Sequence, residues 1–183
     1  EIFSLNEIAA LFDFERVNKS GAKFDPEKAK WFNQQYLRKH SDEELAQLIR
    51  PILKEKGIER DENFLIPFCK LMKEKSHFVH EFYENGKFFF FPPDSYEEKV
   101  ISKKWNEKSK SVFVTLKDRF SFVENWNTEN VTRTFHECET ITGKIDIQLL
   151  RVLITGLGGG PQLFEVLNLL GKDEVVSRLK KSL

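Results

Sequence analysis

The sequence predicts an all-α protein, because helix start and stop signals recur along its whole length. Three segments open with a serine that is followed three residues later by a glutamate: Ser4–Glu7, Ser41–Glu44 and Ser95–Glu98. In such a capping box the two side chains satisfy free backbone N–H groups at a helix start. Gly57 and Gly171 stand where helices are expected to end, a position that glycine favours.

The first half of the chain divides into short helices. Asp25 and Pro26 mark one helix start, since Asp is a good N-cap residue and Pro fits the first helical position. The stretch from Phe14 to Ala22 is expected to be irregular. The expected helices of this half are 4–11, 25–39, one that opens at Ser41 with Leu45, Leu48 and Ile49 on one face, 51–55 and 63–83.

An aromatic run, Phe88–Phe91, followed by Pro92 and Pro93, interrupts the helical pattern. Proline and the residue before it cannot continue a helix, so we expect a domain boundary near Asp94. Four aromatic residues in a row favour core or interface packing over a platform for base stacking. The helices expected after the boundary are 96–105, 109–123, 128–138, 145–154, 161–170 and 173–181.

Composition restricts the class of protein. The chain has 183 residues, of which 40% are hydrophobic and 32% charged, as in an ordinary globular protein with one large or two small domains. Its 29 basic and 29 acidic side chains give a net charge of zero. A non-specific nucleic-acid binder usually has a basic excess, so this balance argues against one without excluding a selective binder.

Two further features concern the origin of the chain. It has no apolar run near the roughly 20 residues that a membrane helix needs, and no signal peptide at its start. Two isolated cysteines, Cys69 and Cys138, fit a reducing cytoplasmic location. The only methionine is Met72, so we interpret the chain as a fragment or a processed product.

Motifs for catalysis, nucleotide binding or metal binding are incomplete. Gly158–Gly160 is followed by Pro161 and lacks the lysine of a phosphate-binding loop, although a helix start after flexible backbone can present N–H groups to RNA. His77 and His80 share a helical face, but a zinc site needs a third ligand in defined geometry. We therefore expect no metal site.

Two basic sets are candidates for RNA contact. Lysines with interleaved aromatic residues suit RNA, whose bases stack on rings and whose phosphates meet ammonium groups, but a solvated charged face has the same composition. One set surrounds Trp105 and the other surrounds the helix start at Asp25. Their members are Lys99, Lys103, Lys104, Lys108 and Lys110, and Lys19, Lys23, Lys28 and Lys30.

Two distant segments together resemble one family. The sequence Arg151–Gly156 leads through the glycine loop to Leu163–Lys172, and near the start Asn18–Pro26 precedes Trp31–Asn33. These blocks resemble the C-terminal, tRNA-binding part of bacterial glutamyl-tRNA synthetases. The resemblance implies two consecutive helical bundles that form an anticodon-binding cage. Residues 1–40 would then be a helical remnant of the stem-contact region, 41–93 the first bundle and 94–183 the second.

The resemblance also implies site residues. The positions that match the family's anticodon-reading residues are Arg151, Gly160 and Leu163 in the second bundle, and Lys73 and Lys75 in the first. Arginine offers a planar fork of donors, and Leu163 would pack against a base or against the loop floor. Many relatives have arginine where Lys75 stands, and it helps them reject glutamine tRNA. Lysine lacks the bidentate fork, so the resemblance leaves the acceptance of glutamine tRNA open. The lysines assigned to the tRNA backbone are Lys19, Lys23, Lys28, Lys103 and Lys104.

The activity implied by the resemblance belongs to a longer chain. The parent, a class I synthetase, would attach glutamate to tRNA(Glu) using ATP and magnesium. Its catalytic domain needs HIGH and KMSKS motifs, and this chain has neither, since Ile101–Lys104 echoes the second only superficially. We therefore expect no catalytic residue and no cofactor here, with tRNA(Glu) and the N-terminal catalytic domain of the same chain as partners, and a monomer. The alternatives are a helical protein–protein adaptor that binds no RNA and a free-standing tRNA-binding module.

Overall fold

The computed structural model describes residues 2–17, 20–21 and 23–183, and these ranges contain helices but no strand. The all-α fold class is therefore confirmed. The α-helices are α1 (Leu5–Leu11), α2 (Pro26–Lys39), α3 (Asp42–Glu55), α4 (Glu62–Met72), α5 (His80–Asn85), α6 (Glu98–Lys104), α7 (Glu107–Ser121), α8 (Thr128–Thr142), α9 (Ile147–Thr155), α10 (Leu163–Leu170) and α11 (Lys172–Ser182), with 3-10 helices η1 (Phe14–Arg16) and η2 (Lys87–Phe89).

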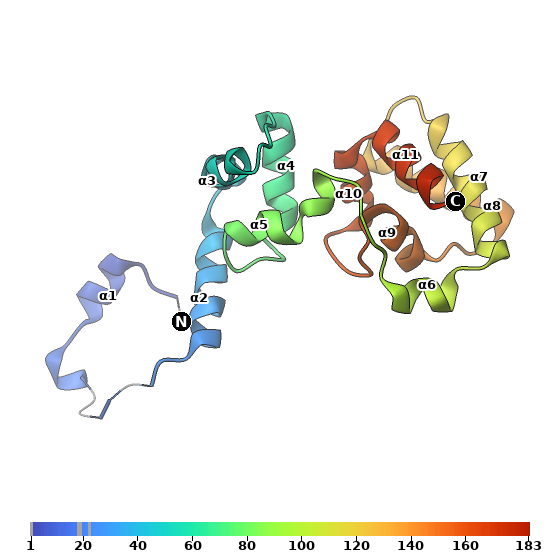
Figure 1. Ribbon diagram of the computed structural model, residues 1–183. Helices are drawn as coiled ribbons and strands as arrows, with labels where there is room; N and C mark the ends of the chain where they lie inside the picture. The colour runs from blue at the N-terminus through green and yellow to red at the C-terminus, as the bar shows by residue number, and fades with distance from the viewer. Residues whose placement is uncertain (1, 18–19, 22) are drawn as a thin grey trace.

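The described helices form two lobes with an extension at the N-terminal end (Figure 1). Helices α3, α4 and α5 make one lobe, and α6 to α9 with α11 make the other. The segment that contains α1 projects away from both lobes, and α1 has no buried residue. No helix in the described part of the chain is long and apolar enough to cross a membrane.

The first lobe is built around aromatic side chains. The ring of Phe68, from α4, lies edge-on to Phe82 at 6.4 Å and to Phe89 at 5.3 Å between ring centroids. Phe88 and Phe89 are buried, whereas Phe91 is half exposed. The expectation that this phenylalanine run packs into a core is therefore confirmed for its first members. Other buried members of this core are Leu37, Leu45, Ile49, Leu53, Leu65, Cys69 and Met72.

The second lobe has its own core, in which α7, α8, α9, α10 and α11 all take part. Its fully buried members include Phe113, Phe120, Leu149 and Val175. Burial of apolar surface on this scale is the main force that holds such helices together. A buried arginine, Arg178, is also satisfied there, because it donates to the Ile154 carbonyl at 2.8 Å and to Glu174 at 2.7 Å.

One helix belongs to both cores. Leu163, Phe164 and Leu167 of α10 pack in the second core, whereas Val166 of the same helix packs in the first. Figure 1 accordingly shows α10 between the two lobes. The division into residues 1–40, 41–93 and 94–183 stays a proposal, since α10 crosses it.

The expectation of a separate helix at 51–55 is wrong, because α3 runs through Pro51 without a break. Proline removes one N–H donor, and the carbonyl that loses its partner is that of Gln47, an exposed residue that water can reach. Burial of Leu45, Ile49 and Leu53 on one side of α3 holds the helix together across this defect. Leu48, expected on the same face, is 48% exposed.

The expected helix 63–83 is also wrong, because it is two helices with an irregular segment between Met72 and His80. The N–H groups of His77 and Phe78 donate to a carboxylate oxygen of Glu81, at 2.6 and 3.3 Å. Asn33, from α2, donates to the His77 carbonyl. The break is therefore held both by a local acceptor, Glu81, and by Asn33, a residue far away in the sequence.

The expected capping box at Ser95–Glu98 does not form. Helix α6 begins at Glu98 and its N-cap residue, Glu97, makes no side-chain cap. Its carboxylate instead accepts a hydrogen bond from the glycine-rich loop, as described below. By contrast, the capping boxes at Ser4 and Ser41 and the glycine that ends α10, Gly171, are confirmed.

Candidate nucleic-acid interface

The glycine-rich loop, residues 156–162, connects α9 to α10 through backbone conformations that favour glycine. Gly156 ends α9 with φ of 81°, and its N–H donates to the Val152 carbonyl at 2.8 Å. Gly160 has φ of 146°, also in the region that L side chains avoid. The loop therefore holds a shape that a chain of ordinary residues would resist.

Arg151 projects from α9 onto the far end of this loop. Its Nη1 donates to the Pro161 carbonyl at 2.7 Å, and a Cβ on Gly160 would lie 3.3 Å from the same nitrogen. The side chain is half-buried, and loss of hydration lowers the pKa of Arg151. A guanidinium stays cationic at neutral pH and carries five N–H donors. One N–H group of Arg151 is thus used to hold the side chain against the loop. The remaining N–H groups could donate to a ligand.

The side chain of Leu163 is only 3% exposed and packs in the second core, so it is not available for contact with a base in this structure. Gln162 caps α10 by accepting from the Glu165 N–H at 2.7 Å. The N–H groups of Leu163 and Phe164 stand in the first turn and have no acceptor within the helix. They are the groups that an anionic or carbonyl ligand could meet.

The two lysines of the first bundle differ in their surroundings. Lys73 forms an ion pair with Asp42 at 2.6 Å, and both side chains are about one-fifth exposed, at 19% and 21%. This contact ties the end of α4 to the start of α3. Lys75 follows in the irregular segment before α5 and is exposed. Lys75 is therefore free to approach a ligand, whereas Lys73 would first have to leave Asp42.

The lysines of α6 differ in the same way. Lys104 donates to Gln148 at 2.7 Å and pairs with Asp146 at 2.9 Å, while Lys103 is exposed. The segment 101–104 that echoes KMSKS lies within α6.

The basic set near α2 lies on the N-terminal extension. Lys23 and Lys28 are exposed, and the Lys28 ammonium stands 5.9 Å from the centroid of the Phe32 ring. Asp25 caps α2 as expected, because its side chain accepts from Glu27 and Lys28 N–H groups. Lys19 lies outside the described residues.

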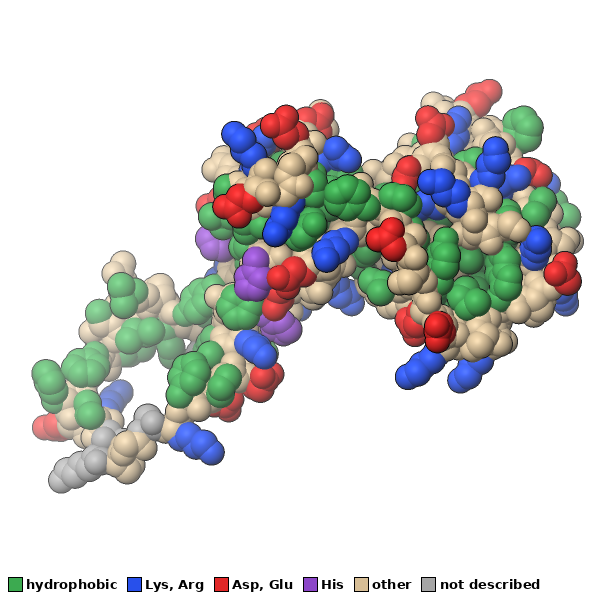
Figure 2. Space-filling view, viewed as in Figure 1, with side chains coloured by type: hydrophobic (Ala, Val, Ile, Leu, Met, Phe, Trp, Pro, Cys, Tyr) green, Lys and Arg blue, Asp and Glu red, His purple; other side chains and the backbone are tan. Residues whose placement is uncertain are grey.

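Charge is mixed on the face of the molecule that Figure 2 shows. Basic and acidic side chains are interspersed on this face of both lobes, with no continuous basic surface there.

Grooves also lie beside the predicted residues. One, of about 780 Å³, runs between α4 and α10, and its charged lining is mostly acidic: Asp42, Asp61 and Glu165 against Lys70. This lining does not favour phosphate. A second, of about 490 Å³, lies where the linker 91–97 meets the start of the glycine-rich loop.

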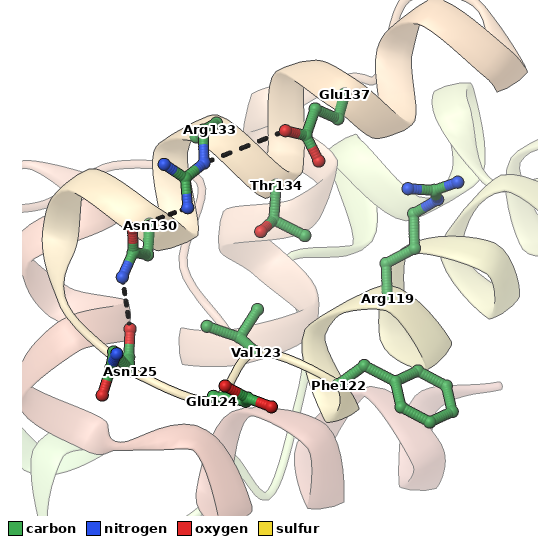
Figure 3. Close-up of a pocket in the computed structure, with 9 residues that line it drawn as sticks. All are labelled: Arg119, Phe122, Val123, Glu124, Asn125, Asn130, Arg133, Thr134 and Glu137. Carbon is green, nitrogen blue, oxygen red and sulfur yellow. Dashed lines mark hydrogen bonds and ion pairs between the residues drawn. The ribbon is translucent and has the colours of Figure 1, made fainter.

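A third groove, of about 590 Å³, lies between the end of α7 and the exposed face of α8 (Figure 3). Arg133 donates to Asn130 at 2.9 Å and pairs with Glu137 at 3.8 Å, while Arg119 points toward the groove from α7. Phe122 is 82% exposed at its edge. No motif in the sequence indicates this groove, because its residues come together only after the chain turns at residues 122–127.

Metal-binding side chains do not gather in the described part of the chain, where no three His, Cys, Asp or Glu side chains lie together as a site would require. His77 instead lies beside Glu81, with 3.5 Å between Nδ1 and Oε2. The two cysteines are both buried, and burial, with the Asp42 charge as a smaller cause, raises the pKa of Cys69 to about 12.

Comparison with known proteins identifies the class to which this fold and loop belong. A family model described as the anticodon binding domain matches residues 44–183. The chain therefore belongs to the anticodon-binding domain family.

The relatives of the chain are glutamate–tRNA ligases. It is 40% identical over 187 residues to that of Flavobacterium johnsoniae and 38% identical over 186 residues to that of Phocaeicola vulgatus, in each case across 100% of this chain and 37% of the relative. It thus spans about 37% of the length of these curated relatives. The crystal structure of a glutamate tRNA ligase from Elizabethkingia meningosepticum in complex with its amino acid is similar, with a TM-score of 0.90 and 33% identity. The match covers 98% of this chain and 36% of the solved chain. A glutamate-tRNA synthetase from Elizabethkingia anophelis matches with a TM-score of 0.87 and 31% identity.

Proposed function

We propose that this chain binds the anticodon arm of glutamate tRNA as part of a longer glutamate–tRNA ligase. The relatives carry that name, and the chain matches them from end to end. The observation that carries the proposal at residue level is the half-buried Arg151, which donates one hydrogen bond to the glycine-rich loop beside it. Such a preorganised fork can read a base edge at low entropic cost.

The proposed contacts fall into two groups. Arg151, the backbone from Gly160 to Leu163, and Lys75 would meet the anticodon bases, and the exposed lysines Lys23, Lys28 and Lys103 would meet phosphates. Lys73 and Lys104 could join only by giving up their ion pairs with Asp42 and Asp146. Lys19 would extend the second group, but it lies outside the described residues.

The chain would contribute orientation rather than chemistry. Holding the anticodon arm places the distant acceptor end of the tRNA at the catalytic domain, which converts an encounter into an ordered complex. In the proposed parent protein, ATP and magnesium would be bound outside this chain, and the glutamate–tRNA ligase reaction would take place there. We further propose a monomer in the cytoplasm, and light scattering on the purified protein tests its mass.

The test compares two RNAs. One is glutamate tRNA and the other is the same tRNA with a changed third anticodon base, each titrated with the protein at fixed low salt. A well-placed bidentate contact discriminates between bases by about 1–3 kcal/mol, so we expect roughly tenfold tighter binding of the native RNA. Arg151→Ala should abolish this difference. Arg133→Ala, which removes the same charge from an exposed position of the same bundle, should preserve it.

Other outcomes would redirect the proposal. Equal binding of both RNAs that falls steeply with salt indicates a generic phosphate surface rather than an anticodon reader. If neither RNA binds, the protein–protein adaptor becomes the better explanation. Preference for the native anticodon that survives Arg151→Ala would remove Arg151 from the site while leaving the function in place.

A further inference from the structure

The linker between the two lobes is fastened to the glycine-rich loop by one residue, Glu97. Its N–H donates to the Gly156 carbonyl at 3.0 Å. Its carboxylate accepts from the Gly158 N–H at 2.7 Å, across 61 positions of sequence. A carboxylate that accepts a backbone N–H makes a charge-assisted bond, which is stronger than a neutral one. Glu97 therefore bonds to the loop at two points, through its backbone N–H and through its side-chain carboxylate.

The backbone of the linker also approaches the loop closely at Gly156. A Cβ on Gly156 would stand 2.6 Å from the Ser95 carbonyl oxygen and 2.9 Å from the Cβ of Pro93. Both distances are shorter than side-chain carbons tolerate, so the two backbones can approach this closely only because residue 156 is glycine. The start of the loop therefore packs directly against residues 93–97.

The other end of the loop is in contact with Arg151. Pro161 accepts from its Nη1 at 2.7 Å, and Gly160 packs beside the same nitrogen. Thr155 fastens the beginning of the loop to α9, because its hydroxyl donates to the Arg151 carbonyl at 2.8 Å and accepts from the Leu157 N–H at 3.2 Å. A displacement of Gly158 would thus be transmitted along three residues to the carbonyl that fixes the Arg151 fork.

We infer that Glu97 is a positioning residue for anticodon recognition: it holds the glycine-rich loop so that Arg151 and the loop N–H groups keep the geometry that a base requires. This inference rests on the proposed function. It assigns a role in RNA binding to an acidic side chain, which on charge alone would oppose a polyanion. If Glu97 positions the loop, removing its carboxylate should weaken RNA binding. If Glu97 only repels the phosphates, removing it should strengthen RNA binding.

Four variants in the complete protein encoded by the gene separate these views. Glu97→Ala removes the acceptor, and Glu97→Gln keeps an oxygen that can accept the Gly158 N–H but removes the charge. Glu98→Ala removes an equal charge from the next residue, which is exposed. Gly158→Ala disturbs the same contact from the loop, since the new Cβ would lie 2.7 Å from the Glu97 Oε2 and the flexible Glu97 side chain would have to move away.

The first measurement is titration with the native and third-base-changed glutamate tRNAs. We expect Glu97→Ala to weaken binding of the native RNA by about tenfold and to reduce the preference between the two, in line with loss of a hydrogen bond to a charged group. Glu97→Gln should recover most of this loss. Glu98→Ala should bind both RNAs as tightly as the unaltered protein or more tightly. Gly158→Ala combined with Glu97→Ala should cost no more than either alone.

The second measurement needs no RNA. Amide hydrogen exchange of residues 156–162 should speed up in Glu97→Ala and Gly158→Ala but not in Glu98→Ala, while exchange in the second core stays unchanged. Faster exchange without any change in anticodon preference would overturn the inference, because the loop would then be held for another reason. Tighter binding by Glu97→Ala would also overturn it, in favour of simple charge repulsion. If the unaltered protein shows no preference, the proposed function fails, and the exchange result still shows whether Glu97 holds the loop.

Discussion

At the scale of single residues, Lys104 is a tether between α6 and the start of α9. It contacts Gln148 and Asp146, and Asp146 also caps α9 by accepting from the Leu149 N–H at 2.9 Å. Partial burial acts to raise the pKa of Asp146, but the hydrogen bonds from Lys104 and the Leu149 N–H outweigh it, so the pKa lies below its ordinary value of 3.8. The carboxylate form is therefore the one that stabilises the fold.

This tether predicts a pH-dependent loss of stability in Lys104→Met. A depressed carboxyl pKa contributes stability above the unfolded pKa and loses it as the pH falls through the folded pKa. The side chains of Lys104 and Asp146 are 32% and 41% exposed, so solvent weakens their ion pair. We therefore expect Lys104→Met to lower the free energy of unfolding by only about 0.5–1 kcal/mol near pH 7. Urea unfolding from about pH 7 down to about pH 3 should show this difference shrinking as Asp146 is protonated, toward the part that the hydrogen bond to Gln148 contributes.

The exposed neighbour Lys103 provides the matched control. Lys103→Met should leave the free energy of unfolding unchanged over the same pH range, within about 0.5 kcal/mol. A loss in Lys104→Met that stays constant with pH would contradict a contribution from the ion pair with Asp146, because it would come from the hydrogen bond to the neutral Gln148 side chain instead.

The same residues mark the limit of what composition reveals at this scale. The sequence shows that Lys73, Lys75, Lys103 and Lys104 are basic, but not that Asp42 and Asp146 neutralise one of each pair. Their partners come from other helices, so only the fold brings them together. The glycine-rich loop was easier to foresee, because glycine has a local backbone reason to stand there.

At the scale of elements, α3 tolerates a proline in its interior, and this defect should be removable. Pro51→Ala restores an N–H that can donate to the Gln47 carbonyl and removes the ring from the helix surface. An interior proline costs about 3 kcal/mol relative to alanine, part of which is offset because proline also restricts the unfolded chain. We expect Pro51→Ala to raise the free energy of unfolding by about 2 kcal/mol, measured by urea unfolding.

Pro26 serves as the control for this variant, since it occupies the first turn of α2, where no helical N–H partner is lost. Pro26→Ala should bring no gain. Equal gains from both substitutions would show that the effect arises outside the helix interior.

Helix boundaries were predictable where the signal is local and not where it is tertiary. Asp25 with Pro26, the capping box at Ser41 and the terminal Gly171 all mark ends that the structure confirms. The break between α4 and α5 has a local acceptor, Glu81, but also a contact from Asn33 of α2. At the start of α6, Glu97 turns to the glycine-rich loop. The local sequence does not reveal these distant partners.

At the scale of the whole molecule, two lobes were expected from the Phe-Pro interruption, but their dependence on one shared helix was not. The 3.6-residue period of α10 gives it apolar residues on more than one side: Leu163, Phe164 and Leu167 serve the second core and Val166 the first. The sequence shows that this helix is strongly apolar, yet an apolar helix can equally be buried within one bundle. The assignment of Val166 to the other core required the structure.

This sharing predicts that the two lobes unfold together. Val166 is fully buried in the first core, although Leu163, Phe164 and Leu167 of the same helix pack in the second. Val166→Ala should therefore lower the free energy of unfolding by about 2 kcal/mol and leave a single transition. Trp105 and Trp126 pack against the second core, so in a Trp31→Phe background tryptophan fluorescence reports that lobe, whereas far-ultraviolet circular dichroism reports all helices. The two signals should change at the same urea concentration.

Val175→Ala serves as the control, because Val175 is equally buried but lies only in the second core. If the two cores are coupled, fluorescence and circular dichroism should again change at the same urea concentration. An early phase in circular dichroism without a change in fluorescence would mean that the first lobe unfolds alone, and that α10 seats it without making the two lobes one cooperative unit.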